Sequence, residues 1–292
     1  MFYVMIGALL WGLDGIVRRG LFNLQPSIVV FWEHVLGAVV LTPFVIKNLR
    51  ELKKLNRKEW LAVFAVCLFS GALGTIFYTA ALGKVNYIQF SVVVLLQQLQ
   101  PIWAISTAYL VLKEKIKKGF VPWAILAIAS SYLVTFKDLK VNLHTGQGTI
   151  IAAVFALLAG MMWAMSTSFS KIFLKRISSK LATYLRFVIS PIFAYLVILF
   201  SGKTDEILKL SISNWKSLFV IVLSTGLVAQ LIYYFGLKKV QAKKSAIYEL
   251  TFPTTAIFVD YFYFKNTLSA TQLLGAFLVI LSIYKIAKLK NG

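Results

Sequence analysis

Apolar residues run through the chain in ten long stretches separated by short polar gaps. As helices, most of these stretches could cross the ~30 Å of hydrocarbon in a bilayer, because a helix rises ~1.5 Å per residue. Strands of membrane barrels are only about ten residues long and alternate between apolar and polar positions, so the pattern predicts helices. We expect transmembrane helices over residues 2–17, 27–46, 60–82, 87–112, 120–136, 148–170, 181–201, 215–237, 245–264 and 269–284.

The first and last of these helices are short for a membrane span. We expect Arg18, Arg19, Lys285 and Lys288 to lengthen them by reaching toward lipid head groups. Because the first stretch contains Asp14, we interpret it as a retained helix rather than a cleaved signal peptide.

Composition agrees with a membrane protein. Of the 292 residues, 59% are hydrophobic and 14% are charged, whereas a soluble domain is about 25% charged. These values exclude a soluble or disordered chain, and one cysteine excludes a disulfide scaffold. Cys67 lies in an apolar run, where we expect a small buried side chain.

The net charge of +21 comes from residues placed between the helices. Arg186 is the exception, since it falls inside an apolar stretch. The gaps after even-numbered helices, together with the C-terminal tail, hold most of the basic residues, so this side is predicted to be cytoplasmic. We therefore expect a multi-pass protein of the cytoplasmic (inner) membrane with both termini in the cytoplasm. This distribution argues against a nucleic-acid partner.

The chain contains an internal repeat. Residues 60–85 align without gaps with 215–240. The identical pairs in this alignment are Trp60/Trp215, Phe64/Phe219, Leu68/Leu223, Gly71/Gly226, Tyr78/Tyr233, Leu82/Leu237, Lys84/Lys239 and Val85/Val240. At a slightly different offset Trp11 aligns with Trp163, His34 with Arg186, and Pro101 with Pro253.

The repeat divides the chain into residues 1–137 and 148–288, with five predicted helices in each half. Since five is odd, the second half must enter the membrane from the opposite side, and the repeats are predicted to be inverted. Inverted repeats are typical of secondary transporters, whose halves exchange roles during transport. The alternative is an ancestral duplication kept only for stability.

Several short motifs occur in a distinctive order. They are Ala8-Leu9-Leu10-Trp11-Gly12, Gly71 to Tyr78 followed by Ala80-Ala81-Leu82, Leu99-Gln100-Pro101-Ile102, and Lys113-Glu114-Lys115. In these motifs the chain resembles the drug/metabolite transporter superfamily, in particular its ten-helix EamA-type members. The resemblance implies a central cavity lined by the first four helices of each half, with the fifth and tenth helices peripheral. The chain departs from the family pattern at two positions. His34 stands where members often have Arg, and Asn266 replaces, in the second half, the acidic residue Glu114 of the first half.

Polar side chains inside predicted helices are the first candidates for function, because a charge at mid-helix costs about 2.5–3.5 kcal/mol. Trp11, Asp14 and Arg18 are spaced three and four residues apart and so share one helix face. The matching face in the second half carries Trp163, Ser166, Thr167 and Ser170. We predict one cavity shared by both faces, with plain packing or interfacial anchoring as the alternative for the tryptophans.

Glu33 and His34 are adjacent, so their side chains diverge by roughly 100° on a helix. We expect His34, the counterpart of Arg186, to point inward, and Glu33 to pair with another helix or border the cavity. A purely structural pair of Glu33 with Arg18 or Arg186 is the alternative. Arg186 either neutralises one of the carboxylates or binds the acidic end of a substrate, and both interpretations stay open.

Glu249 lies on a polar stripe that passes through Pro253, and its counterpart Gln97 lies one turn before Pro101. Each proline frees a backbone carbonyl one turn earlier and bends the helix. Aromatic side chains add flat walls that suit an apolar or cationic part of a substrate. Asp260 is expected to pair locally with Lys265.

The predicted substrate-binding residues are Trp11, Asp14, His34, Tyr78, Gln97, Trp103, Trp163, Arg186, Tyr233 and Glu249. The candidates for proton coupling are Asp14, Glu33 and Glu249.

Enzyme signatures, metal-ligand spacings and phosphate-binding loops are missing from the sequence, so we expect no catalytic residue, no metal and no cofactor. The prediction is a secondary active transporter that moves a small polar metabolite by alternating access, with proton coupling. Three carboxylates beside one Arg and one His favour an amino-acid-like or amine-bearing substrate. The alternatives are an uncoupled exchanger or facilitator, a drug exporter of the same fold, a passive channel and a membrane-embedded enzyme. We expect a monomer or homodimer surrounded by membrane lipid.

Overall fold

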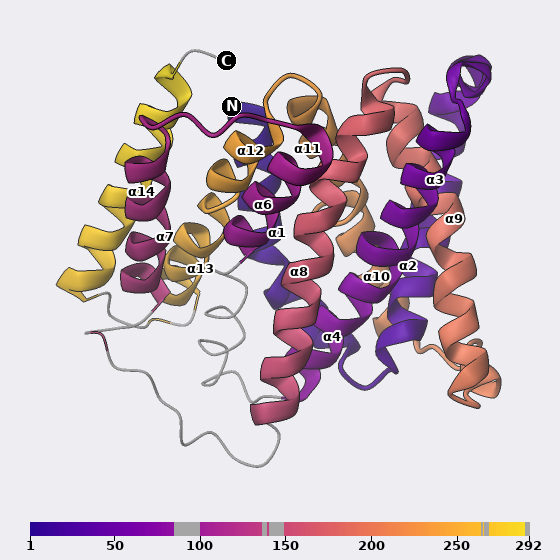
Figure 1. Ribbon diagram of the computed structural model, residues 1–292. Helices are drawn as coiled ribbons and strands as arrows, with labels where there is room; N and C mark the ends of the chain where they lie inside the picture. Colours follow the sequence, from indigo (N-terminus) through magenta and orange to yellow (C-terminus); the bar gives the residue numbers. More distant parts are fainter. Residues whose placement is uncertain (85–99, 136–138, 140–148, 264, 266–268, 290–292) are drawn as a thin grey trace.

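The computed structural model describes residues 1–84, 100–135, 139, 149–263, 265 and 269–289. All regular structure in these residues is helical (Figure 1). Six helical segments of this part of the chain are long and apolar enough to cross a membrane: Pro26–Lys54, Arg57–Gly83, Val154–Leu174, Ser179–Phe200, Ile212–Leu237 and Ala270–Lys288. Two shorter apolar helices are Gln100–Leu112 and Val121–Val134. The predicted all-helical membrane class is confirmed for the described residues.

The helices of the N-terminal part are α1 (Phe2–Arg18), α2 (Pro26–Val45), α3 (Arg57–Val66), the π-helix η3 (Cys67–Gly74), α4 (Thr75–Lys84), α6 (Gln100–Leu112) and α7 (Val121–Thr135). Those of the C-terminal part are α8 (Thr149–Leu174), α9 (Ser179–Phe200), α10 (Ile212–Leu223), α11 (Leu227–Leu237), α12 (Ala242–Tyr248), α13 (Thr251–Phe262) and α14 (Ala270–Lys288). Short 3₁₀ turns cover Arg19–Leu21 (η1), Ile46–Lys54 (η2) and Thr204–Glu206 (η6).

Local sequence signals set several helix starts. Pro26 opens α2, where its missing N–H costs nothing. Capping boxes start α3 at Asn56, α10 at Ser211 and α14 at Ser269. These caps satisfy backbone N–H groups that have no hydrogen-bond partner within the helix.

Three of the predicted helices are interrupted near their middle. The stretch that contains Gly71 widens into the π-helix η3, and its repeat partner breaks at Gly226 between α10 and α11. The stretch that contains Pro253 breaks between α12 and α13, at Glu249 and Leu250. Discontinuous helices free backbone groups in the membrane, and transporters place their substrate sites at such breaks.

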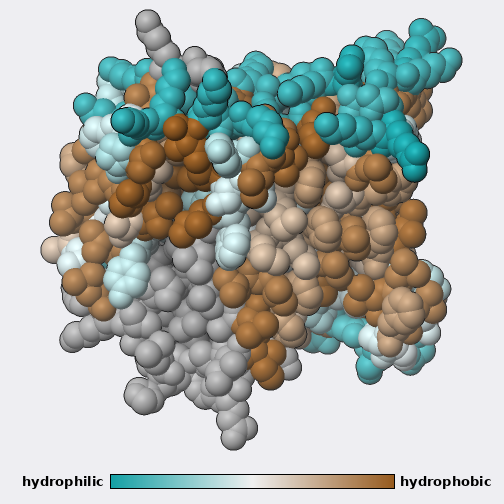
Figure 2. All heavy atoms as spheres, in the orientation of Figure 1, coloured by the Kyte–Doolittle hydropathy of each residue, from teal (hydrophilic) through white to brown (hydrophobic). Residues whose placement is uncertain are grey.

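The helices pack as neighbouring pairs around a centre. In Figure 1, α7 and α14 lie side by side at one edge, away from α3 and α9. α2 packs on α9, and α1 lies between α11 and α13, while α8 contacts α3, η3, α4 and α6. Figure 2 shows a hydrophobic band across the visible face, with hydrophilic residues gathered along the upper edge and a smaller group at the lower right.

Lysine side chains bound to backbone carbonyls tie the helix ends together at the edge that holds the N-terminus. Lys171 in α8 donates to the carbonyl oxygens of Leu237 at 2.9 Å and Val240 at 2.7 Å, at and just beyond the end of α11. Lys238 donates to the carbonyl oxygen of Ile177 at 2.8 Å. The cations thus meet the carbonyl groups that a helix leaves unbonded at its C-terminus.

α1 and α11 approach closely because both carry glycine at the contact. A Cβ on Gly236 would lie 2.8 Å from the backbone nitrogen of Val4. Membrane helices use such small residues to pack their backbones together.

We therefore expect Gly236→Ala to lower the free energy of unfolding by about 1–3 kcal/mol, because the added methyl group overpacks this contact. Gly119→Ala is the control, since the nearest atom to its new Cβ is Leu289 Cδ2 at 4.0 Å. Unfolding in detergent can be followed with a thiol-reactive dye, because the buried thiol of Cys67 is the chain's one cysteine. Equal melting temperatures for the two variants would contradict the close approach.

Candidate functional site

A cavity of about 1130 Å³, counting the part that opens to solvent, lies between the central helices. Its walls come from α1, α2, η3, α4, α6, α8, α9, α11, α12 and α13. Among the predicted site residues, the cavity lining includes Trp11, Asp14, Glu33, His34, Tyr78, Trp163, Arg186, Tyr233 and Glu249. These side chains, which are up to 238 positions apart in the numbering from Trp11 to Glu249, thus face one space.

Two predicted substrate-binding residues do not join this group. Trp103 is 40% exposed on α6 and does not line the cavity. Gln97 lies outside the described residues, as does the side chain of Asp260, and the predicted Asp260–Lys265 pair therefore stays a prediction.

A buried ion cluster occupies the part of the cavity next to α1 and α2. Arg18 Nε contacts Asp14 Oδ2 at 2.5 Å, and Arg18 Nη2 contacts Glu33 Oε2 at 3.1 Å. Thr225 donates to Asp14 Oδ1 at 2.6 Å. The arginine is only 3% exposed, so the cluster is buried. Without this cation, both carboxylates would be unpaired charges in an apolar interior.

This cluster corrects the expectation that Arg18 reaches toward lipid head groups. The side chain points inward because the two carboxylates and Thr79, which accepts a hydrogen bond from Nη1 at 3.3 Å, offer it polar partners that lipid tails lack. It also shows that Glu33 pairs with Arg18, one of the alternatives left open by the sequence.

Glu249 is held by neutral groups. Its Oε1 accepts hydrogen bonds from Tyr233 at 2.7 Å and from Ser245 at 3.0 Å, and its Oε2 accepts one from Gln100 at 2.9 Å. No salt bridge among the described residues involves Glu249. The carboxylate at the α12–α13 break is thus available to a cationic, proton-bearing or hydroxyl-bearing partner.

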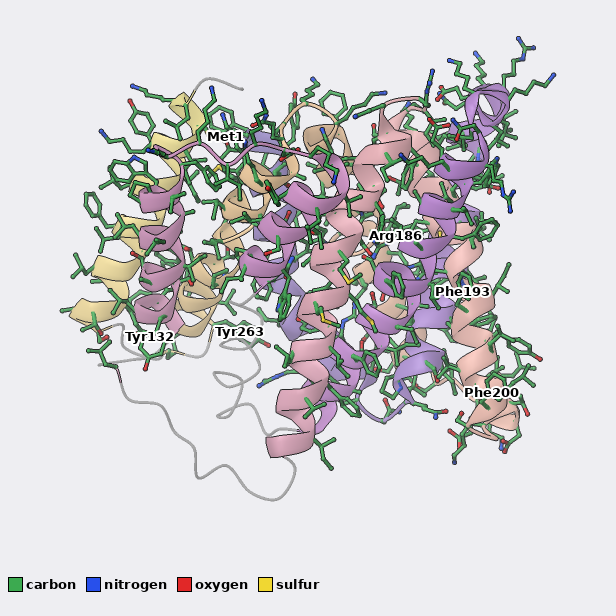
Figure 3. The ribbon with its side chains drawn as sticks, in the orientation of Figure 1. Met1, Tyr132, Arg186, Phe193, Phe200 and Tyr263 are labelled. Carbon is green, nitrogen blue, oxygen red and sulfur yellow. The ribbon has the colours of Figure 1, made fainter. Side chains whose placement is uncertain are left out.

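Arg186 projects from α9 into the centre of the bundle, whereas Phe200 marks the outer end of the same helix (Figure 3). It donates to the side-chain oxygen of Ser70 at 2.5 Å and to the Ser70 carbonyl at 3.0 Å. The ion pairs of the described residues do not include Arg186. Of the two interpretations from the sequence, contact with a ligand agrees better with this geometry than neutralisation of a carboxylate.

His34 points into the cavity and leaves one nitrogen without a partner. Nδ1 lies 2.9 Å from the carbonyl oxygen of Val30, and the ring stacks on Phe187 with centroids 4.7 Å apart. The other nitrogen, Nε2, is buried and makes no hydrogen bond to any of the residues that the structure describes. The same holds for Gln230 Nε2 and Ser166 Oγ, which also belong to cavity-lining residues. Buried polar atoms without partners are uncommon and mark places where a ligand can bind.

Two aromatic pairs stand in the cavity wall. Trp11 packs on Tyr233 with ring centroids 4.9 Å apart, and Trp163 packs on Tyr78 at 5.2 Å. The internal repeat exchanges the two pairs, since Trp11 aligns with Trp163 and Tyr78 with Tyr233. The cavity thus has a similar aromatic surface in each half of the chain.

The sequence interpretation missed Gln230, Thr225, Ser70 and Thr75 as cavity residues. The repeat carries a signal that could have found them. Ser70 aligns with Thr225 and Thr75 with Gln230, so polar residues recur at matching positions of otherwise apolar stretches. All four lie within two turns of the glycines at which these stretches are interrupted.

Apolar helices around a polar chamber with breaks in its walls define a multi-pass membrane transport protein. The chain belongs to the EamA-like transporter family, whose sequence pattern matches residues 1–136 and 150–287. This confirms the resemblance that the sequence motifs indicated.

Known proteins are similar over nearly the whole chain. A protein of Fusobacterium nucleatum named riboflavin transporter ImpX is 37% identical over 288 residues, which are 98% of this chain and 96% of the relative. Protein LicB of Haemophilus influenzae is 26% identical over 96% of both chains. A solved crystal structure superposes with a TM-score of 0.73 at 12% identity, covering 98% of this chain and 96% of that chain, which indicates a shared fold.

The ion cluster gives a stability prediction. Arg18→Met leaves Asp14 and Glu33 as unpaired buried charges, and we expect a loss of about 3–5 kcal/mol in the free energy of unfolding. Lys209→Met removes a cation from the pair with Asp205, whose side chains are 67% and 68% exposed, and should cost at most about 1 kcal/mol.

Thermal unfolding in detergent measures both variants. Adding Asp14→Asn and Glu33→Gln to Arg18→Met should restore part of the lost stability, because the uncompensated charges are then gone. An Arg18→Met variant as stable as the wild type would contradict a structural role for the cluster.

Proposed function

We propose that this protein carries riboflavin, or a closely related flavin, across the membrane by alternating access. The observation that carries the proposal is the central cavity with an aromatic Trp–Tyr pair in each half and neutral hydrogen-bonding groups between them. The relative named as a riboflavin transporter supports this cargo, because its similarity extends over the whole cavity-forming chain.

Riboflavin suits the side chains of the cavity in its chemistry. Its three fused rings are flat, uncharged at neutral pH and suited to stacking on aromatic side chains. Its hydroxyl-rich side chain and ring carbonyls need hydrogen-bond partners when they leave water.

Alternating access rests on inverted halves, and the helix packing supports this part of the proposal. Tyr3 of α1 packs on Phe235 near the end of α11, and Lys171 near the end of α8 binds carbonyls at the same place. The repeat-related helices α1 and α8 therefore run in opposite directions. The contacts of α1 with α11, and of α8 with α3, η3 and α4, correspond under the repeat.

The orientation in the membrane follows from charge. Basic residues of η2 and of the α8–α9 turn lie at the end of the bundle that holds Met1, along the hydrophilic edge in Figure 2. We assign this end to the cytoplasm, because basic loops remain on that side of the inner membrane.

An amino-acid-like or amine-bearing substrate is the second candidate function. Glu249 and Arg186 face the same cavity and form no ion pair among the described residues, and a zwitterion would complete both. Under this candidate, amino acids bind and riboflavin does not compete with them.

The first test measures riboflavin binding by the purified protein through the quenching of flavin fluorescence. We expect saturable binding, and counterflow of labelled riboflavin in proteoliposomes. Trp163→Ala should weaken binding about tenfold, because one stacking contact is worth about 1–3 kcal/mol. Trp103→Ala removes an exposed tryptophan outside the cavity and should bind as the wild type does. Absence of saturable binding and of counterflow would end the riboflavin proposal.

Proton coupling gives a second test. Asp14 and Glu33 are already paired with Arg18, so Glu249 is the carboxylate best placed to take up a proton. An imposed pH gradient should stimulate riboflavin uptake by the wild type and by Asp14→Asn, but leave uptake by Glu249→Gln unchanged. A wild-type protein that does not respond to the gradient would be an uncoupled exchanger or facilitator.

A further inference from the structure

The cavity is lined by residues whose buried polar atoms have no hydrogen-bond partner among the described residues. His34 is 2% exposed and Gln230 is 5% exposed, yet His34 Nε2 and Gln230 Nε2 make no hydrogen bond in the part of the chain that the structure describes. Leaving such a group buried without a partner is energetically unfavourable. A ligand that supplies both partners would recover this energy on binding.

The hydrogen-bonding role of each group follows from its other contacts. In a neutral ring, His34 Nδ1 must carry the proton, because the Val30 carbonyl can only accept. His34 Nε2 is then an acceptor. The Gln230 side-chain NH₂ is a donor, and the guanidinium of Arg186 has five N–H groups, more than its two bonds to Ser70 use. The cavity therefore offers donor groups and one unpartnered imidazole acceptor.

These three side chains converge from different helices. His34 stacks on Phe187, the residue that follows Arg186 in α9. Gln230 lies one turn after Gly226 in α11, and a Cβ on Gly226 would lie 3.1 Å from an oxygen of Glu33, the neighbour of His34. α9 packs against both α2 and α11, so the three cavity-lining side chains lie on helices that meet at α9.

We infer that His34, Arg186 and Gln230 form an edge site that binds the pyrimidine-like edge of the flavin ring. That edge presents an N–H group, N3–H, between two carbonyl oxygens, which is the complement of an acceptor between donors. His34 Nε2 accepts from N3–H, while Arg186 and Gln230 donate to the carbonyl oxygens. This inference rests on the proposed function and assigns the orientation of the substrate within that cavity.

The orientation places the hydroxyl-rich side chain of riboflavin at Glu249. Hydroxyl groups donate to carboxylates, and Glu249 is fixed by Tyr233, Ser245 and Gln100 without a cation that would compete for it. The aromatic pairs Trp11–Tyr233 and Trp163–Tyr78 supply surfaces on which the flat ring system can stack.

The test compares riboflavin with two analogues. In 3-methylriboflavin the N3–H is replaced by a methyl group, and in lumiflavin the hydroxyl-bearing chain is replaced by a methyl group. The wild-type protein should bind 3-methylriboflavin about tenfold or more weakly than riboflavin, because His34 Nε2 is left unpartnered and crowded. This comparison needs no variant and does not depend on how substitutions fold.

Variants then assign each contact. His34→Phe keeps the stacking on Phe187 but removes the acceptor, so riboflavin and 3-methylriboflavin should bind it equally, within about twofold. Glu249→Gln should weaken riboflavin about fivefold or more and leave lumiflavin binding unchanged, because only the side chain of riboflavin reaches it. Trp103→Phe, outside the cavity, is the matched control and should keep the wild-type preference.

The outcomes separate the edge site from the proposed function. If riboflavin and 3-methylriboflavin bind the wild type equally, or if His34→Phe keeps the full preference, the edge site is overturned while riboflavin transport stands. If Glu249→Gln weakens the binding of riboflavin and of lumiflavin equally, Glu249 does not contact the hydroxyl-bearing chain, and the inferred orientation fails. If no flavin binds the wild type, the proposed function falls and the edge site with it.

Discussion

The constraint on which this structure depends is the cost of placing charge among apolar helices. Arg18 contacts two carboxylates, so one cation is shared by both acidic groups of α1 and α2. Arg186 and Glu249 are instead held by neutral groups, Arg186 by Ser70 and Glu249 by Tyr233, Ser245 and Gln100. The first arrangement stabilises the fold, whereas the second keeps charge available inside the cavity.

Much of the fold could be predicted from the sequence, because hydrophobic length is a direct consequence of bilayer thickness. The interruptions at Gly226 and in η3 could not be located this way, since hydropathy does not register how a helix is hydrogen-bonded. The repeat nevertheless aligned Gly71 with Gly226, and a search for polar residues near these glycines would have found the cavity positions Ser70 and Thr225.

Cavity residues could be predicted from the sequence where the residue type is costly to bury in a membrane. They were harder to predict where the residue type is common in membrane helices. The cavity lining includes four ionisable residues that were predicted to face it, because an ionisable side chain is costly in contact with lipid tails. They are Asp14, His34, Arg186 and Glu249. Trp103 shows the limit, since tryptophan is tolerated at lipid-facing positions as well as in cavities. The ion-pair partners of Arg18 could not be predicted from the sequence. Its position in the chain is compatible both with an inward ion pair and with a side chain that extends toward lipid head groups.

The lysine ties at the N-terminal end of the bundle have a consequence for how this protein can change during evolution. Lys171 and Lys238 bind backbone carbonyls of Leu237, Val240 and Ile177 rather than acidic side chains. Every amino acid carries a carbonyl group, so these bonds do not depend on which side chain occupies the accepting position. The hydrogen bonds themselves therefore constrain the two lysines more than the side chains of the residues that accept from them.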